Sequence, residues 1–164
     1  MAIDVYLQLD GIKGESSDEL NKGWIECKSV NWEVLQPKSA TASTGGGHTA
    51  ERTEHKDIVI SKLADMATPL LLQTCSSGKT IPKAQLKFMR ADGQGARILY
   101  FQIDLENVLI SSVAPSVAQG DILTESVSLK YSKVKWKYTQ QKVGGGSGGN
   151  TSGGWDLSAN KIAS

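Results

Sequence analysis

The chain has 164 residues, of which 39% are hydrophobic and 21% are charged, and its formal net charge is +1. This size and composition predict one domain, residues 1–164, with a real core, and they argue against global disorder. The small net charge argues against nucleic acid as a partner, because binding to phosphates requires clustered Lys and Arg. No apolar run approaches the ~20 residues of a membrane span, so no membrane insertion is expected.

The N-terminal third alternates between strand patterns and polar connections. Apolar and polar residues alternate over residues 3–9, which indicates a half-buried strand. Residues 24–35 are rich in Val, Ile and Trp and predict a second strand, and a third is expected at 55–63. Residues 38–54 are mostly small, polar or charged, so we expect a long extended loop there. A loop of this length in a compact domain is usually functional or disordered.

One short helix is predicted at about residues 65–77. Asp65 or Thr68 can cap its N-terminus, and Pro69 suits an early helical position because its missing N–H would have no partner there. Gly78 supplies the left-handed residue that ends a helix. The apolar side of the helix is expected to consist of Leu70, Leu71, Leu72 and Cys75.

The C-terminal half predicts further strands joined by turns. They are expected at 82–90, 96–107, 108–113 and 123–138, with a hairpin turn at Asp92-Gly93-Gln94-Gly95. In the last of these strands the apolar positions change from odd to even numbers, which predicts a β-bulge near Ser132 or Lys133. Residues 143–154 are Gly- and Ser-rich like a flexible linker, and a short docking strand is expected after them. The elements together predict a mainly β fold: a small closed antiparallel β-barrel with one short α-helix and a long extended loop.

Several motifs that suggest a ligand lack the context that the ligand requires. Residues 144–149 match the spacing of a dinucleotide-binding loop, but no helix is expected after them. Gly78-Lys79-Thr80 resembles the end of a phosphate-binding loop, yet it ends the predicted helix instead of preceding one. His48 and His55, in or beside the polar loop, match no established metal-ligand spacing and offer little support for a catalytic triad. We therefore predict no enzyme activity, no cofactor and no metal.

Cysteine content and the N-terminus bear on the compartment. Cys27 and Cys75 are too few for a disulfide scaffold, so buried free thiols are the favoured interpretation and one disulfide is the alternative. Residues 1–5 lack the basic start and long apolar stretch of a signal peptide, so synthesis in the cytoplasm is expected. Export by a specialised machine would leave no such mark in the sequence.

Several segments resemble the haemolysin-coregulated protein (Hcp) family, in the family's order and spacing, along nearly the whole chain. They are Met1-Ala2-Ile3-Asp4, Gly11-Ile12-Lys13-Gly14-Glu15-Ser16, Thr68-Pro69 with Leu71, Cys75-Ser76-Ser77-Gly78-Lys79, Pro82 with Ala84 and Leu86, residues 108–113 and 123–129, and the Gly-rich stretch before Gly154-Trp155-Asp156. No single motif is decisive, but the chain is identified as a member by their order. The departures from the family pattern lie mostly in the 38–54 loop and the final tail.

The resemblance implies the tube subunit of the type VI secretion system. Such a subunit forms hexameric rings that stack into a tube inside a contractile sheath, and contraction propels the tube and its spike into a neighbouring cell. The implied partners are other copies of the chain, sheath proteins, a spike protein and small effector proteins held in the ring lumen. The implied location is extracellular or inside the target cell, after export without a cleaved signal peptide.

Two sets of residues are candidate contact sites for this function. The polar 38–54 loop suits contact with the next ring. Its ring-stacking candidates are Ser43, Thr44, Gly45, Gly46, Gly47 and His48. Lys28 and Asn31 in the second predicted strand are candidates for contact with the lumen and its cargo, and ordinary outward polar residues are the alternative.

Two competing functions stay open. One is a carbohydrate- or peptide-binding module on a β-sandwich, for which four tryptophans offer aromatic platforms, although their place in alternating strands is more typical of core or interface. The tryptophans are Trp24, Trp32, Trp136 and Trp155. The other is a hydrolase with an unrecognised site, which no legible pair of nucleophile and base supports.

Overall fold

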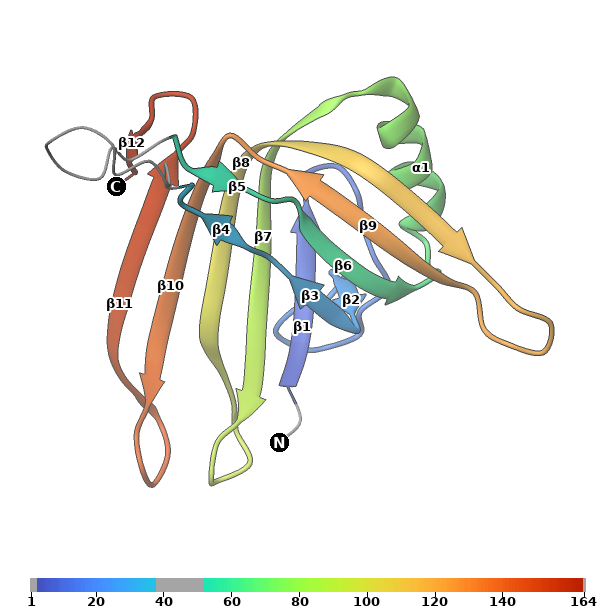
Figure 1. The fold of residues 1–164 in the computed structure, drawn as a ribbon. Coiled ribbons are helices and arrows are strands. Elements are labelled where there is room, and N and C mark those ends of the chain that lie inside the picture. The colour runs from blue at the N-terminus through green and yellow to red at the C-terminus, as the bar shows by residue number, and fades with distance from the viewer. Residues whose placement is uncertain (1–2, 38–51, 164) are drawn as a thin grey trace, which may run out of the picture.

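The computed structural model describes residues 3–37 and 52–163. In these residues the chain is mainly β with one short α-helix, as the sequence predicts (Figure 1). No helix in these ranges is long and apolar enough to cross a membrane. The elements in chain order are β1 (Ile3–Leu9), β2 (Ile25–Cys27), β3 (Ser29–Asn31), β4 (Val34–Leu35), β5 (Glu54–His55), β6 (Ile58–Leu63), α1 (Thr68–Ser77), β7 (Thr80–Ala91), β8 (Arg97–Ser116), β9 (Thr124–Lys130), β10 (Lys133–Gln141), β11 (Ser147–Asp156) and β12 (Lys161–Ile162).

The described strands form one large antiparallel sheet and a small two-stranded sheet made of β4 and β5. Along one edge β8 pairs with β7, β7 with β1, and β1 with β2. Along its other edge β8 pairs with β10 and β9, β9 with β6, and β6 with β3. Lys28 joins β2 directly to β3 along the chain. Starting from β8, the order of neighbouring strands therefore passes through β7, β1, β2, β3, β6 and β9 and returns to β8. β11 and β12 extend the sheet beyond β10.

The single strand predicted at 24–35 is wrong, because the chain changes partners twice within it. At Lys28 it leaves β1 for β6, and the Lys28 N–H donates to the carbonyl oxygen of Ser61 at 2.7 Å. The side chains that pack against the core change from odd to even positions at the same point, from Cys27 to Val30. The predicted third strand divides likewise, since β5 pairs with β4 while β6 pairs with β3 and β9.

Helix α1 begins at Thr68 and ends where Gly78 adopts a left-handed φ of 67°. The N–H of Gly78 donates to Thr74 and Cys75, which confirms the predicted C-terminal stop. At the other end Ala67 is the capping residue and has no side-chain cap, but Asp65 accepts a bond from the Ala67 N–H at 2.9 Å. Of the four residues predicted to form the apolar side of the helix, Leu71 is buried and Cys75 is half-buried, whereas Leu70 and Leu72 are exposed.

The regular strand structure is interrupted at the same level of the sheet in three neighbouring segments. Pro82 in β7 lacks a backbone N–H, Asn107 in β8 has a positive φ of 52°, and Ser132 lies in the break between β9 and β10. At this level the Asn107 amide donates to the Ser132 hydroxyl at 3.0 Å. The core-facing positions shift by one residue on passing this level: they are Ile81, Ala84 and Leu86 in β7, Ile103, Leu105, Val108 and Ile110 in β8, and Val127, Leu129 and Val134 in β9 and β10. The predicted strand 123–138 with a bulge is therefore two strands with a break between them.

β11 lies in the Gly- and Ser-rich segment that resembles a linker in sequence. It pairs with β10 over nearly its whole length, from Ser147 opposite Gln141 to Asp156 opposite Lys133. The backbone groups of β10 make this ladder and require no particular side chain on β11. Gly154 also approaches β10 closely, because a Cβ there would lie 2.8 Å from the carbonyl oxygen of Val134. The strand thus begins well before the short one expected after residue 154.

Candidate assembly surface

The predicted ring-stacking residues, Ser43, Thr44, Gly45, Gly46, Gly47 and His48, lie outside the described residues. The base of their loop is described, and it is ordered by the β4–β5 pair, in which Val34 faces His55. The Thr53 hydroxyl donates to the Leu35 carbonyl at 3.1 Å, and Lys56 and Glu33 form an exposed ion pair at 3.4 Å. The described residues on the two sides of 38–51 are therefore held together in a small, hydrogen-bonded sheet.

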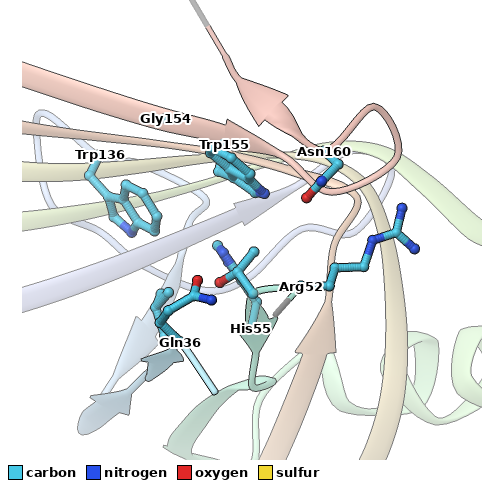
Figure 2. Close-up of a pocket in the computed structure, with 9 residues that line it drawn as sticks. Gln36, Arg52, His55, Trp136, Gly154, Trp155 and Asn160 are labelled. Atoms are coloured by element: carbon cyan, nitrogen blue, oxygen red, sulfur yellow. The ribbon is translucent and has the colours of Figure 1, made fainter. Parts of the chain in front are cut away.

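A pocket of about 510 Å³ lies between this loop base and the edge formed by β10, β11 and β12 (Figure 2). Its lining combines aromatic and aliphatic surface with several polar side chains. The lining residues are Val34, Gln36, Arg52, Thr53, His55, Trp136, Gly154, Trp155 and Asn160. Figure 2 shows Trp136 at one end of this group, Arg52 at the other, and Trp155 above His55. We call this feature the edge pocket.

Some polar groups of the edge pocket have hydrogen-bond partners in the described part of the chain and others have none. The His55 ring stacks on Trp136, with 6.1 Å between ring centroids, and its Nδ1 is 2.9 Å from the Tyr131 hydroxyl. Burial lowers the pKa of His55, which favours the neutral imidazole at pH 7. The indole Nε1 of Trp155 is buried without an acceptor, and Arg52 makes no hydrogen bond or ion pair in the described part of the chain. The pocket is therefore lined by two tryptophans and by a guanidinium that has no partner among the described residues.

Lys28, between β2 and β3, and Asn31, the last residue of β3, are both exposed. Lys28 lines a second pocket, of about 340 Å³, beside the carboxylates of Glu26 and Asp65. Asn31 is at the end of β3, opposite Val59 of β6, and does not line that pocket. The structure thus does not bring the two candidates into one site, and their contact with a lumen stays a prediction.

An exposed apolar hairpin projects from the domain between β8 and β9. All residues from 114 to 123 are exposed, and Val117 and Ile122 keep 61% and 65% of their surface accessible. Gly120 turns the chain with a φ of 81°, and the Asp121 N–H donates to the Ala118 carbonyl at 3.0 Å. Exposed apolar side chains gathered on one ordered element commonly mark an interaction surface. We call residues 117–123 the projecting hairpin.

A buried ion network lies beside the start of α1, and it is absent from the sequence-based prediction. The Lys62 ammonium pairs with the Glu125 carboxylate and with Asp65, the latter at 2.9 Å, and donates to the Leu63 carbonyl. Thr68 donates to Glu125 at 2.9 Å. The side chains of Lys62 and Glu125 are 1% and 0% exposed. The network ties β6 and β9 to the helix.

A signal for this network is present in the sequence. Lys62 continues the core-facing alternation of Ile58 and Ile60, and Glu125 continues that of Val127 and Leu129. Opposite charges at core-facing positions of two strands indicate a cross-strand pair, and Lys62 does lie opposite Glu125. The sequence does not show that β6 pairs with β9, so only the structure shows that these two charges face each other.

The motifs that suggested ligands have structural roles in the described residues. Gly78 ends a helix, and Gly144, Gly145 and Gly146 form the turn between β10 and β11 with positive φ angles. His55 is engaged by Tyr131 and Trp136, while His48 lies outside the described ranges. Cys27 and Cys75 are free and half-buried. Burial raises the pKa of Cys27 to about 12, so its thiol is protonated at pH 7.

The fold and its exposed features define a mainly β protein with one short helix, a projecting hairpin and no catalytic constellation in the described residues. The profile of the family described as "Type VI secretion system effector, Hcp" matches residues 6–138. Protein hcp1 of Pseudomonas aeruginosa is 35% identical over 162 residues, which cover 98% of each chain. The chain belongs to the Hcp family of type VI secretion.

Solved structures agree with this assignment. A structure described as that of a type six secretion system protein superposes with a TM-score of 0.92 at 27% identity, covering 99% of this chain and 100% of the other. Hcp1 from Salmonella typhimurium superposes with a TM-score of 0.79 at 31% identity over the same shares. A further relative, the major exported protein of Pseudomonas aeruginosa, is 27% identical and covers 90% of this chain. None of these relatives is named as an enzyme.

Proposed function

We propose that this chain is a structural, non-enzymatic subunit of the type VI secretion tube, which assembles into hexameric rings that stack and carry effector proteins in their lumen. Membership of the Hcp family is the observation that carries this proposal. The edge pocket and the projecting hairpin support it, because a subunit of a ring must offer two different surfaces to its two neighbours.

The test is the mass of the purified protein, by light scattering after gel filtration at several concentrations. A particle of six times the chain's 17.6 kDa is expected, and electron microscopy then reports whether rings stack. A monomer at all concentrations would contradict the tube subunit. It would favour a binding module instead, for which ligand quenching of Trp136 and Trp155 fluorescence is the readout.

Stacking is assigned to the 38–54 loop, which the sequence makes too polar for a core. Deletion of residues 40–50 is expected to leave rings intact and to abolish stacking and secretion. The matched control shortens a different connection, the turn at 142–146 between β10 and β11, which should leave secretion unchanged. Normal tubes from the loop deletion would contradict this role.

Cargo contact is assigned to Lys28 and Asn31, whose side chains are exposed. Lys28→Glu and Asn31→Gln are expected to reduce retention of an effector on purified rings without changing ring mass. Retention equal to that of the unmodified protein would remove both residues from the lumen. The spike and sheath are further proposed partners, and export is proposed to proceed without a cleaved signal peptide.

A closed barrel is also part of the proposal. The order of neighbouring strands returns to β8, and the Lys28 N–H bond to Ser61 holds β2 and β3 at the corner where the ladder passes from β1 to β6. Closure leaves fewer unpaired strand edges, and the remaining outer edge of β11 is the one that a neighbouring subunit would cover.

A further inference from the structure

The edge pocket and the projecting hairpin lie at opposite ends of the molecule. Figure 1 shows the loop between β8 and β9 projecting at the right, whereas β4, β5 and β10 to β12 lie toward the left. We infer that the projecting hairpin of one subunit docks into the edge pocket of the next. This inference rests on the proposed ring, and it names the two surfaces that meet within it.

Charge complementarity is the first argument. Arg52 lines the edge pocket and has no hydrogen bond or ion pair in the described part of the chain. Asp121 is at the tip of the projecting hairpin, fully on the surface, and among the described residues its carboxylate bonds only to the neighbouring Ile122 N–H, at 2.8 Å. Neither group has an ionic partner among the described residues, and because they lie at opposite ends of the molecule they can pair between copies but not within a copy.

Size and apolar character are the second argument. A cavity of ~150 Å³ holds a molecule as large as benzene, so the edge pocket of about 510 Å³ has room for more than one side chain. Trp136 and Trp155 are the two tryptophans that line it. Val117 and Ile122 are the most exposed of the large apolar side chains on the hairpin, and Ile122 directly follows Asp121. Their burial on the indoles would remove apolar surface of both partners from water.

Symmetry is the third argument. A hairpin and a pocket on opposite ends make a head-to-tail contact, in which each subunit uses its hairpin toward one neighbour and its pocket toward the other. Such contacts close into a ring when the rotation between subunits divides a full turn. A two-fold contact, by comparison, would require one patch to meet its own copy.

Charge exchange tests the contact on the full chain. Arg52→Glu places two acidic groups at every interface, and Asp121→Arg places two basic groups there. Each variant alone is expected to assemble only at concentrations at least about tenfold higher than the unmodified protein.

An equal mixture of the two variants should restore assembly when they alternate around the ring. The hairpin of the Arg52→Glu subunit keeps Asp121, which meets the unchanged Arg52 of the Asp121→Arg subunit. At the next interface the introduced arginine of the hairpin meets the introduced glutamate of the pocket, so every contact again joins opposite charges. Native mass spectrometry should then detect rings with three copies of each variant.

Ile122→Ser is a second test that changes no charge, and it should likewise weaken assembly by about tenfold or more. Its matched control is Val143→Ser, since Val143 is an apolar residue that is fully exposed on another hairpin. Near-ultraviolet circular dichroism checks that each variant keeps its packed tryptophans.

The outcomes separate the inference from the proposed function. Unmodified protein in rings, together with unaltered rings of Arg52→Glu, Asp121→Arg and Ile122→Ser, would overturn the docking and leave the tube subunit standing. Dissociated single variants that fail to assemble on mixing would overturn the direct pairing of these two surfaces. Unmodified protein that stays monomeric would overturn the proposed function, and the docking with it.

Discussion

Lys62→Met should destabilise the domain far more than the loss of one surface ion pair. Methionine matches the lysine side chain as far as Cε and lacks only the ammonium, so the packing of the stem changes little. Glu125, 0% exposed, would keep only the Thr68 hydroxyl as partner among the described residues, with the Asp65 carboxylate nearby. An uncompensated buried charge of this kind costs about 3–5 kcal/mol.

The control is Glu33→Gln, which breaks the ion pair with Lys56 beside the two-stranded sheet. Both of these side chains are about half exposed, at 53% and 52%, so the expected change is below about 1 kcal/mol. Each change removes one charge: Lys62 is shared by the buried Glu125 and by Asp65, whereas Glu33 pairs with Lys56 on the surface. The comparison therefore sets a buried ion network against an exposed pair.

Urea unfolding followed by tryptophan fluorescence measures both changes, at a protein concentration where all variants have the same assembly state. With an m-value of about 2 kcal/mol per molar urea, Lys62→Met should lower the unfolding midpoint by roughly 1.5–2.5 M. A loss of stability within about 1 kcal/mol of that of Glu33→Gln would refute the reasoning. It would mean that water or a structural shift compensates the carboxylates.

Three further predictions concern backbone and buried groups. Gly14→Ala should destabilise by about 1–3 kcal/mol in thermal unfolding, since a Cβ would lie 2.4 Å from the Trp24 carbonyl oxygen, whereas Gly93→Ala, with open space around it, should change stability little. Asn107→Gly should be nearly neutral and Asn107→Val should lose at least about 1–2 kcal/mol, because φ is positive there; equal losses would contradict this. Burial raises the pKa of Cys27 and of Tyr131 to about 12, so both groups stabilise the fold fully below their unfolded pKa values, about 8.5 and 10. Stability should therefore fall as pH rises from 8.5 toward 12, and less steeply in Cys27→Ser and Tyr131→Phe; unchanged slopes would contradict it.

Local chemistry made much of the fold predictable. The period-two alternation of residues 3–9 defines β1, because successive side chains of a strand point to opposite faces. Pro69 and Gly78 locate α1, since each acts through its own backbone geometry and needs no distant partner. The family was equally predictable from the sequence, because the order and spacing of many short segments do not depend on how the chain folds.

Partner strands decided what local chemistry left open. The composition of segment 24–35 predicts one strand. Its successive parts, however, pair with β1, with β6 and with β5, so the segment is broken at Lys28 and again before Val34. β11 has the composition of a linker, yet the free backbone edge of β10 makes it a strand. A ladder is formed by backbone groups that every residue carries, so composition does not reveal it.

The sequence by itself determined the mainly β class, the position of the helix and membership of the Hcp family. Only the tertiary structure placed Lys62 against Glu125, gathered Arg52 with Trp136 and Trp155 in the edge pocket, and set the hairpin of Asp121 at the opposite end. The physical reason is sequence distance: these residues come from strands and connections far apart in the chain, and only the pairing of the strands brings them together or holds them apart.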